Sequence, residues 1–174
     1  MDKYYFLISE LPYLIFGEEP AVTRRYFLEE ARKWLYNDDF QSLIQANINE
    51  FSIDEKIIPQ VLYEYRFFEN KLRSELVLWR EARQQGNEYK SILFPQSLVK
   101  EGNPLQIERN FLFFRWKFIE ELEIGHCFDV EAVILYYLKL QILERLFSFN
   151  KEKGSERFKQ LIESSFEDNI SEVV

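Results

Sequence analysis

The sequence predicts an all-α fold, a multi-helix bundle in which long antiparallel helices surround one buried central helix. Apolar residues recur at three- and four-residue intervals over long stretches, which is the period of one face of an α-helix. The five glycines and five prolines stand mostly at the ends of these stretches, where helices begin and stop. The third observation is the run from Ala132 to Leu138, which is apolar or aromatic throughout. Seven residues cover about two helical turns, so a helix there has no side for water and must be wrapped by other helices.

An apolar segment, residues 1–16, opens the chain. Its continuous apolar run at 4–8 suits either a strand or a packed helical turn. Thr23 can then cap a first clear helix over 23–36. The inward stripe of that helix is expected to consist of Phe27, Ala31, Trp34 and Leu35.

A short helix and a long one are expected next. The polar pair at 37–38 can form a turn and cap before a helix over 39–48. Residues 52–55 have the spacing of a capping box, and Pro59 suits the first turn of the following helix. That helix, 59–85, has the clearest pattern in the sequence. Its apolar stripe recurs every three or four residues, at Val61, Tyr65, Phe68, Leu72, Leu76 and Trp79.

Two polar features accompany the long helix. Glu69 and Arg73 stand four residues apart on the side opposite the stripe, in the order that favours an ion pair. Gly86 ends the helix as a C-terminal cap would. It also begins the longest interruption in the chain, the loop-rich break at 86–104, which is expected to contain one short helix around 89–94.

The central helix lies in the second half of the chain. A helix over 105–124 is stopped by Gly125, and Asp129 is placed to cap the central helix over 130–149. This helix pair, hinged at a short polar turn, is the core of the predicted bundle.

A last amphipathic helix is expected to open at Gly154, and residues 169–174 are expected to fray. The length suits a single core and nothing requires a second domain, so residues 1–174 are interpreted as a single helical domain. The apolar stripe of the last helix is expected to consist of Phe158, Leu161, Ile162 and Phe166.

Charge and composition exclude several classes of protein. The net charge of −8 and the sequence pI near 4.9 argue against binding to a phosphate backbone, so no nucleic-acid partner is expected. The single cysteine, Cys127, excludes an intrachain disulfide and fits a reducing compartment. No signal peptide is recognisable, and no apolar run approaches the ~20 residues of a membrane span. We therefore expect a soluble cytoplasmic protein that does not itself insert into a membrane.

The turn before the central helix contains the candidate catalytic and metal-binding residues. Cys127 adjoins His126, but neighbours in a turn rarely face one another, and no third group is evident to orient the histidine. A metal site would need carboxylates such as Asp129 and Glu131 to complete it. There is no glycine-rich phosphate loop. We therefore expect no catalytic residues, no metal and no cofactor, and interpret the segment as a helix–helix turn.

Aromatic residues make up 17% of the chain. Most of them are expected to lie in the core, and the excess over ordinary composition leaves room for a surface that binds a partner.

Several blocks of the sequence resemble a small uncharacterised bacterial family whose members are usually encoded among the subunits of a rotary V/A-type ATPase (ATP synthase). Together they cover most of the chain, and each alone is only moderately specific. The blocks are Tyr4-Tyr5-Phe6-Leu7 with Leu11-Pro12, Glu69-Asn70-Lys71-Leu72-Arg73 with Arg80 and Ala82, Arg115-Trp116 with Glu120-Glu121-Leu122, His126-Cys127-Phe128-Asp129, the run Tyr137-Leu138-Lys139-Leu140-Gln141-Ile142-Leu143-Glu144-Arg145, and Lys153-Gly154.

The resemblance implies a non-catalytic coupling subunit that stands in for the C (d-like) subunit. It would link the central stalk to the membrane rotor ring for ion transport, held at the inner membrane through these protein partners. Ordinary C subunits are three-lobed and considerably longer, and 174 residues cannot form three such lobes. Whether the chain replaces the whole C (d-like) component or part of it stays open, as do the residues that contact partners. The alternative is a helical adaptor or regulatory interaction domain with an unrelated partner.

Overall fold

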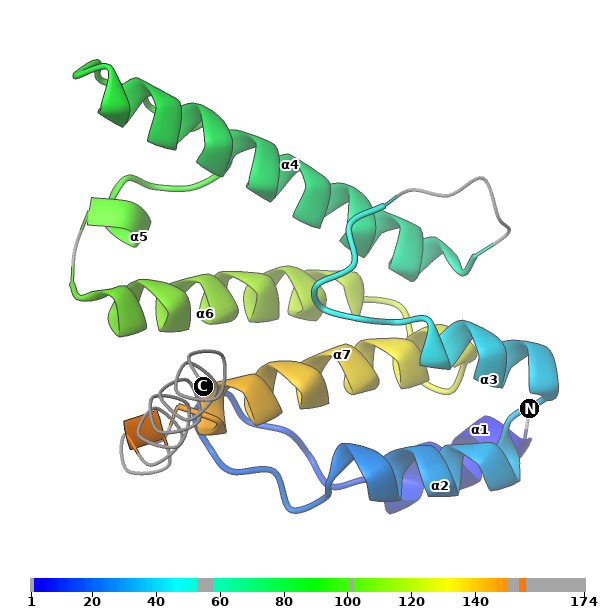
Figure 1. The fold of residues 1–174 in the computed structure, drawn as a ribbon. Coiled ribbons are helices and arrows are strands. Elements are labelled where there is room, and N and C mark those ends of the chain that lie inside the picture. The colour runs from blue at the N-terminus through cyan, green and yellow to red at the C-terminus, as the bar shows by residue number, and fades with distance from the viewer. Residues whose placement is uncertain (1, 53–57, 101, 150–153, 156–174) are drawn as a thin grey trace, which may run out of the picture.

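The computed structural model describes residues 2–52, 58–100, 102–149 and 154–155, and within these ranges the protein contains helices and no strands (Figure 1). The predicted all-α fold class is confirmed. The helices are α1 (Asp2–Glu10), α2 (Arg24–Trp34), α3 (Asn37–Ile44), α4 (Gln60–Gln84), α5 (Ser97–Lys100), α6 (Pro104–Leu122) and α7 (Val130–Phe147).

The N-terminal apolar run, which suited a strand or a helical turn, forms helix α1. Its Leu7 is 1% exposed and belongs to the main hydrophobic core. The helix packs against α2 and α7, and Tyr4 of α1 donates a hydrogen bond to Asp39 of α3. Helix α1 therefore has tertiary contacts with three other helices.

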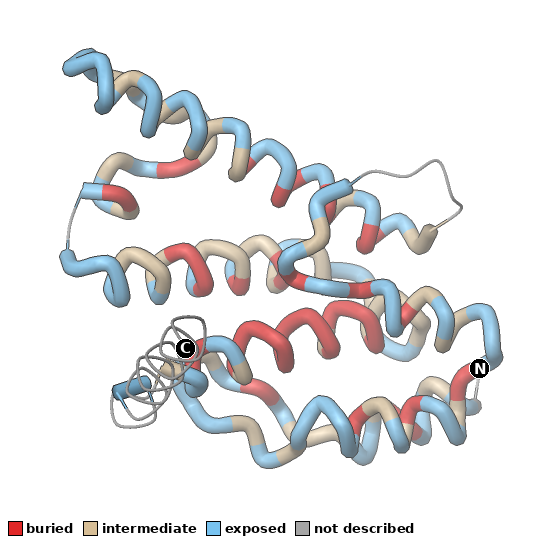
Figure 2. The backbone as a smooth tube through the Cα atoms, viewed as in Figure 1, coloured by how far each residue is buried: buried red, intermediate tan, exposed pale blue. Residues whose placement is uncertain are grey.

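Helix α7 is the central helix of the bundle. It packs against α1, α2, α3, α4 and α6, and its middle is almost continuously buried (Figure 2). Leu135 and Leu138 are both 0% exposed, and even the polar Lys139 and Gln141 are buried. The prediction that a helix with an apolar stretch on every side must be surrounded by other helices is confirmed, because neighbouring helices cover the middle of α7.

The cap predicted for this helix is also present. Asp129 has an extended backbone conformation and its side chain accepts a hydrogen bond from the backbone N–H of Ala132 at 2.8 Å. Thr23 caps α2 in the same way, through the N–H of Tyr26. Both residues satisfy donors that an α-helix leaves free in its first turn.

Replacing Asp129 with alanine should lower the free energy of unfolding by about 1 kcal/mol, the usual value for the loss of an N-cap. Urea denaturation checks the change. Thr23→Ala provides the matched control, because it removes the equivalent bond from α2 and should cost a similar amount. An Asp129→Ala variant as stable as the parent would contradict the capping role.

The helix expected over 39–48 begins two residues earlier than predicted, and its predicted end is wrong by four residues. Helix α3 begins at Asn37, after Tyr36 in an extended conformation, and it stops at Ile44. The backbone beyond it is bound by Gln141 of α7, whose amide donates to the carbonyl of Ala46 at 2.9 Å and accepts from the N–H of Ile48 at 3.3 Å. These bonds hold that backbone outside a helix, and no local pattern in the sequence reveals them.

The short helix expected around 89–94 is wrong as well, because α5 forms farther along the chain. The carboxylate of Glu75 accepts hydrogen bonds from the hydroxyl of Tyr89 at 3.1 Å and from the N–H of Ile92 at 3.3 Å. Pro95 follows, and a residue that precedes proline is disfavoured in the helical conformation. The segment is thereby held as irregular chain against α4.

The two halves of α4 differ in burial. Val61, Tyr65, Phe68 and Leu72 of the predicted stripe are buried, whereas no residue beyond Leu72 in this helix is. A second hydrophobic cluster, which includes Phe68, Leu72, Phe94, Val99 and Phe111, joins α4 to α6 and α5. Past it, α4 diverges from α6 (Figure 1), and an antiparallel alignment of the three long helices is not confirmed.

The remaining helix ends lie within two residues of their predicted positions, with Asn103 as the cap of α6. Most of the capping box at 52–55, most of the predicted last helix and the tail at 169–174 lie outside the described residues; Gly154 and Ser155 are helical. No helix in the described ranges combines the length and the apolarity needed to cross a membrane.

Candidate functional site

Glu69 lies at the centre of an ion-pair network in the interior. Its side chain is 0% exposed and is held in a bidentate arrangement by Arg115 of α6, with Nε and Nη2 each 2.8 Å from one carboxylate oxygen. Arg73 binds the same carboxylate at 2.9 Å. The predicted Glu69–Arg73 pair therefore exists, but its placement away from the apolar stripe was wrong, because Glu69 faces α6. One signal in the sequence indicated the pairing of Glu69 with Arg115, which is that Arg115 stands within the aromatic-rich run 111–118.

The network maintains the charge of Arg115, which is 14% exposed. Burial alone would lower the pKa of this guanidinium, but the hydrogen bonds and the negative charge of Glu69 raise it overall. Burial and the nearby Glu69 charge also raise the pKa of Tyr65, whose neutral hydroxyl donates to the carbonyl of Ile48 at 3.1 Å. Arg115 therefore keeps its charge, and Tyr65 keeps its hydroxyl proton.

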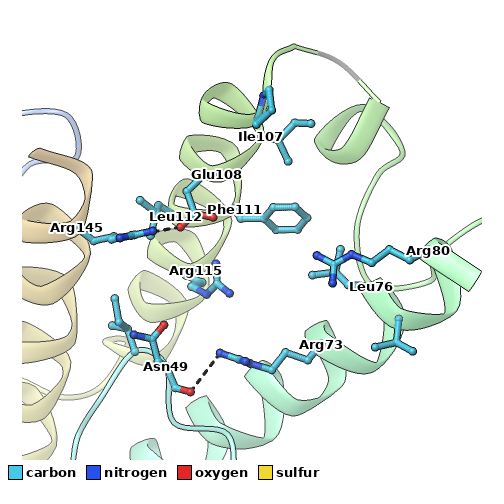
Figure 3. A pocket seen from close by; sticks show the side chains of 13 residues that line it. Asn49, Arg73, Leu76, Arg80, Ile107, Glu108, Phe111, Leu112, Arg115 and Arg145 are labelled. Carbon is cyan, nitrogen blue, oxygen red and sulfur yellow. Dashed lines mark hydrogen bonds and ion pairs between the residues drawn. The ribbon is translucent and has the colours of Figure 1, made fainter. Parts of the chain in front are cut away.

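A cleft of about 620 Å³ opens above this network, between α4, α6, α7 and the segment at 48–49 (Figure 3). Four arginines from the three helices line it, together with apolar side chains of α4 and α6. We call it the arginine cleft and define it by Arg73, Leu76, Arg80, Phe111, Arg115 and Arg145.

The charges in the arginine cleft are only partly neutralised. Glu69 compensates two arginines at once, and Glu108 faces Arg145 at 3.5 Å. Arg80 is exposed, reaches into the cleft (Figure 3) and has no ion pair with any residue that the structure describes. Four arginines against two glutamates leave an excess of two positive charges, in a chain whose net charge is −8.

A second surface feature lies at the opposite end of α7. The rings of Tyr5 and Phe128 have centroids 5.0 Å apart, and Phe6 stacks on Trp34 at 5.5 Å. Tyr5, Phe6 and Phe128 are each about half exposed, at 52%, 49% and 48%. We call Tyr5, Phe6, Trp34 and Phe128 the aromatic patch. Exposed apolar residues in a contiguous group are typical of protein interaction sites.

The patch and the cleft are well separated. Phe128 immediately precedes the cap of α7, whereas Arg145 lies in its last turn. At a rise of 1.5 Å per residue, the length of α7 between Val130 and Arg145 is about 22 Å. The molecule therefore presents two chemically different surfaces at the two ends of its central helix.

The segment at 126–131, which comprises the turn and the first residues of α7, brings three of the four metal-ligand candidates together. Ligand atoms of His126, Asp129 and Glu131 lie within 4.8 Å of one another, whereas Cys127 is exposed and is not part of this group. Both oxygens of Asp129 are already engaged: one contacts His126 Nδ1 at 2.8 Å and the other accepts from the N–H of Ala132. Helix capping accounts for the position of Asp129, and Glu131 in the first turn is favoured by the helix dipole.

We predict that this segment binds no metal, because a metal held by His126 and Asp129 would have to displace the hydrogen bond between them. Metal analysis of protein purified without chelator should find less than about one tenth of an equivalent of zinc; the tetrahedral sites that zinc prefers need three or four ligands. His126→Ala gives the control for any residual signal. Stoichiometric zinc that disappears in this variant would contradict the prediction.

Comparison with known proteins yields one family. Residues 96–169 match a family described as "Protein of unknown function (DUF2764)", over a range that includes α5, α6 and α7. The match covers Arg115, Phe128 and Arg145 but not α4. Neither the curated proteins nor the solved structures include a match to this chain.

Proposed function

We propose that the protein is a non-catalytic coupling subunit of a bacterial V/A-type rotary ATPase, in the place of the C (d-like) subunit. It would join the central stalk to the membrane rotor ring at the cytoplasmic face, by protein contacts alone. The resemblance of its sequence blocks to proteins encoded with such ATPases supports the assignment.

The observation that carries the proposal is the aromatic patch. It joins two of the resembling blocks, because Tyr5 and Phe6 come from the first and Phe128 comes from the turn before α7. These side chains remain about half exposed. Aromatic residues are enriched at protein interfaces. Because these residues belong to the resembling blocks and are exposed, they support the proposal that the aromatic patch contacts a partner protein.

Other residues from the sequence blocks that carry the family resemblance point inward and make the bundle more rigid. Arg115 is bound to Glu69, and the indole of Trp116 donates to Glu120 at 2.8 Å. The ammonium group of Lys139 lies 5.0 Å above the Trp116 ring and pairs with Glu123. A body that transmits torque needs rigid packing and separate surfaces for its two neighbours. The closely packed centre and the two separated surfaces fit that requirement.

The test is to tag the full chain in its native host and to purify it from membranes. Stalk and rotor-ring subunits should be recovered with it, and deletion of the gene should abolish ATP-driven ion transport. Phe128→Ser should lower recovery at least about 5-fold, about 1 kcal/mol of binding, because it removes an exposed aromatic contact. Ile124→Ser is the matched control, since Ile124 is 82% exposed on the same turn but lies outside the aromatic patch.

Three results would contradict the proposal. The ATPase could assemble and couple normally without the gene, the tagged chain could recover no stalk or ring subunit, or the Phe128 and Ile124 variants could lose recovery equally. If the aromatic patch instead recovers an unrelated protein, the chain is the helical adaptor that the sequence leaves as the alternative.

A further inference from the structure

We infer that the arginine cleft binds an acidic, amphipathic segment of a partner polypeptide. This inference concerns the end of α7 opposite the aromatic patch. It stands on the chemistry of the cleft and does not depend on which complex the protein belongs to.

The charge of the cleft selects an acidic occupant. Its positive excess stands out against a chain that is acidic overall, so the cleft attracts negative groups that the rest of the surface repels. Arg80 contributes an exposed guanidinium without an ion pair in the described ranges. Arg73 is positioned by Glu69, by the carbonyl of Asn49 at 3.2 Å and by the ring of Phe51 at 4.4 Å. A guanidinium has five N–H donors, so each arginine retains donors for a ligand.

The apolar lining selects an amphipathic occupant. Leu76 and Ile107 are partly buried, and Val77 is 48% exposed at the edge of the cleft. Beneath them, Phe111 closes the floor and is 7% exposed. Grooves that combine apolar positions with flanking charges are typical of sites where a protein segment inserts one apolar face.

The distribution of the arginines favours a polypeptide over a small anion. A phosphate or carboxylate site directs several donors to one point. Here Arg73 and Arg115 already converge on Glu69, and Arg145 faces Glu108, so the surplus positive charge is divided between Arg80 and the pair Arg73 and Arg115. Arg80 stands on α4 and Arg115 on α6. Several carboxylates on one segment match this spacing better than a single compact charge.

Site-specific photocrosslinking of the full chain in its native host tests the inference. A photoreactive phenylalanine at position 77 lies in the cleft, and the same residue at position 78 is the control, because Leu78 is 45% exposed on α4 but does not line the cleft. The residue at position 77 should crosslink to another polypeptide. The crosslinked stretch of that polypeptide should contain more Asp and Glu than Lys and Arg. Arg80→Glu should lower the yield at least about 5-fold, about 1 kcal/mol of binding, and Arg80→Lys should retain at least half of it.

The other outcomes overturn the inference. A crosslink to residues 156–174 of the same chain, or to a second copy, would make the occupant the protein itself. A neutral or basic peptide would remove the charge argument, and so would an Arg80→Glu variant that crosslinks normally. Absence of any crosslinked polypeptide would leave only a small ligand. An acidic peptide from outside the ATPase would support the inference whatever the membrane purification recovers, and loss of the crosslink would leave the test of the aromatic patch unchanged, so the two proposals can fail separately.

Discussion

Leu135→Asp is expected to lower the free energy of unfolding by at least about 4 kcal/mol, in the range that only severe core changes reach. Leu135 is 0% exposed at the middle of α7, and its neighbours Ile134 and Leu138 are equally buried. An aspartate at this position would be an unpaired charge in apolar surroundings, or would have to take up a proton to become neutral. Since a domain is stable by only ~5–15 kcal/mol, this single change removes much of the total.

Urea denaturation and thermal melting measure the effect. Because the aspartate variant can fail to fold, Leu135→Ala serves as a second variant and should cost about 2–5 kcal/mol through the cavity it leaves. Ile92→Asp is the matched control for the added charge, since Ile92 is 97% exposed, and it should change stability by less than about 0.5 kcal/mol. If Leu135→Asp melted within a degree or two of the parent, α7 would not be the central helix of the core.

Glu69→Gln is expected to cost about 3–5 kcal/mol, although it changes neither volume nor shape. The substitution removes the one negative charge that Arg115 and Arg73 share, and Arg115 is 14% exposed. The cost arises mainly from leaving the largely buried guanidinium of Arg115 uncompensated. Chemical denaturation with an unchanged m-value would confirm that the loss comes from stability and not from a different unfolded state.

The same substitution at an exposed pair provides the control. Glu29 binds Arg25 at 3.0 Å with both side chains largely exposed, so Glu29→Gln should cost no more than about 0.5 kcal/mol. A double change, Glu69→Leu with Arg115→Met, removes both charges and should recover much of the lost stability. If Glu69→Gln and Glu29→Gln had equal effects, the network would contribute no more than a surface pair.

The sequence predicted those parts of the fold that depend on local chemistry. The side chains of Thr23, Asn103 and Asp129 each accept a hydrogen bond from the backbone N–H three residues later, in the first turn of a helix. The sequence pattern identified two of these three caps, Thr23 and Asp129. The long helices were predicted because a 3.6-residue apolar period needs no knowledge of the partner helix. The burial of α7 was predicted for a related reason, since an apolar helix without a polar face cannot remain in water.

The errors occurred where a distant residue decides the local conformation. Helix α3 stops at Ile44 while Gln141, almost a hundred positions away, binds the following backbone. The side chain of Glu75 holds the chain around Tyr89 and Ile92 in an irregular conformation. None of these bonds has a periodic signal in the sequence, because each joins one side chain to a single group elsewhere in the chain.

The candidate surfaces show the same division. The sequence by itself determined an acidic, aromatic-rich chain of helices and placed Tyr5 and Phe128 in separate blocks. Only the tertiary structure decided that their rings meet at the surface, and that Arg115 turns toward Glu69 beneath a cleft lined by Arg80. Periodicity specifies which face of a helix is apolar, whereas the rotation and crossing of α4 against α6 depend on the packing of both. That packing determines which charges face one another and which side chains remain exposed.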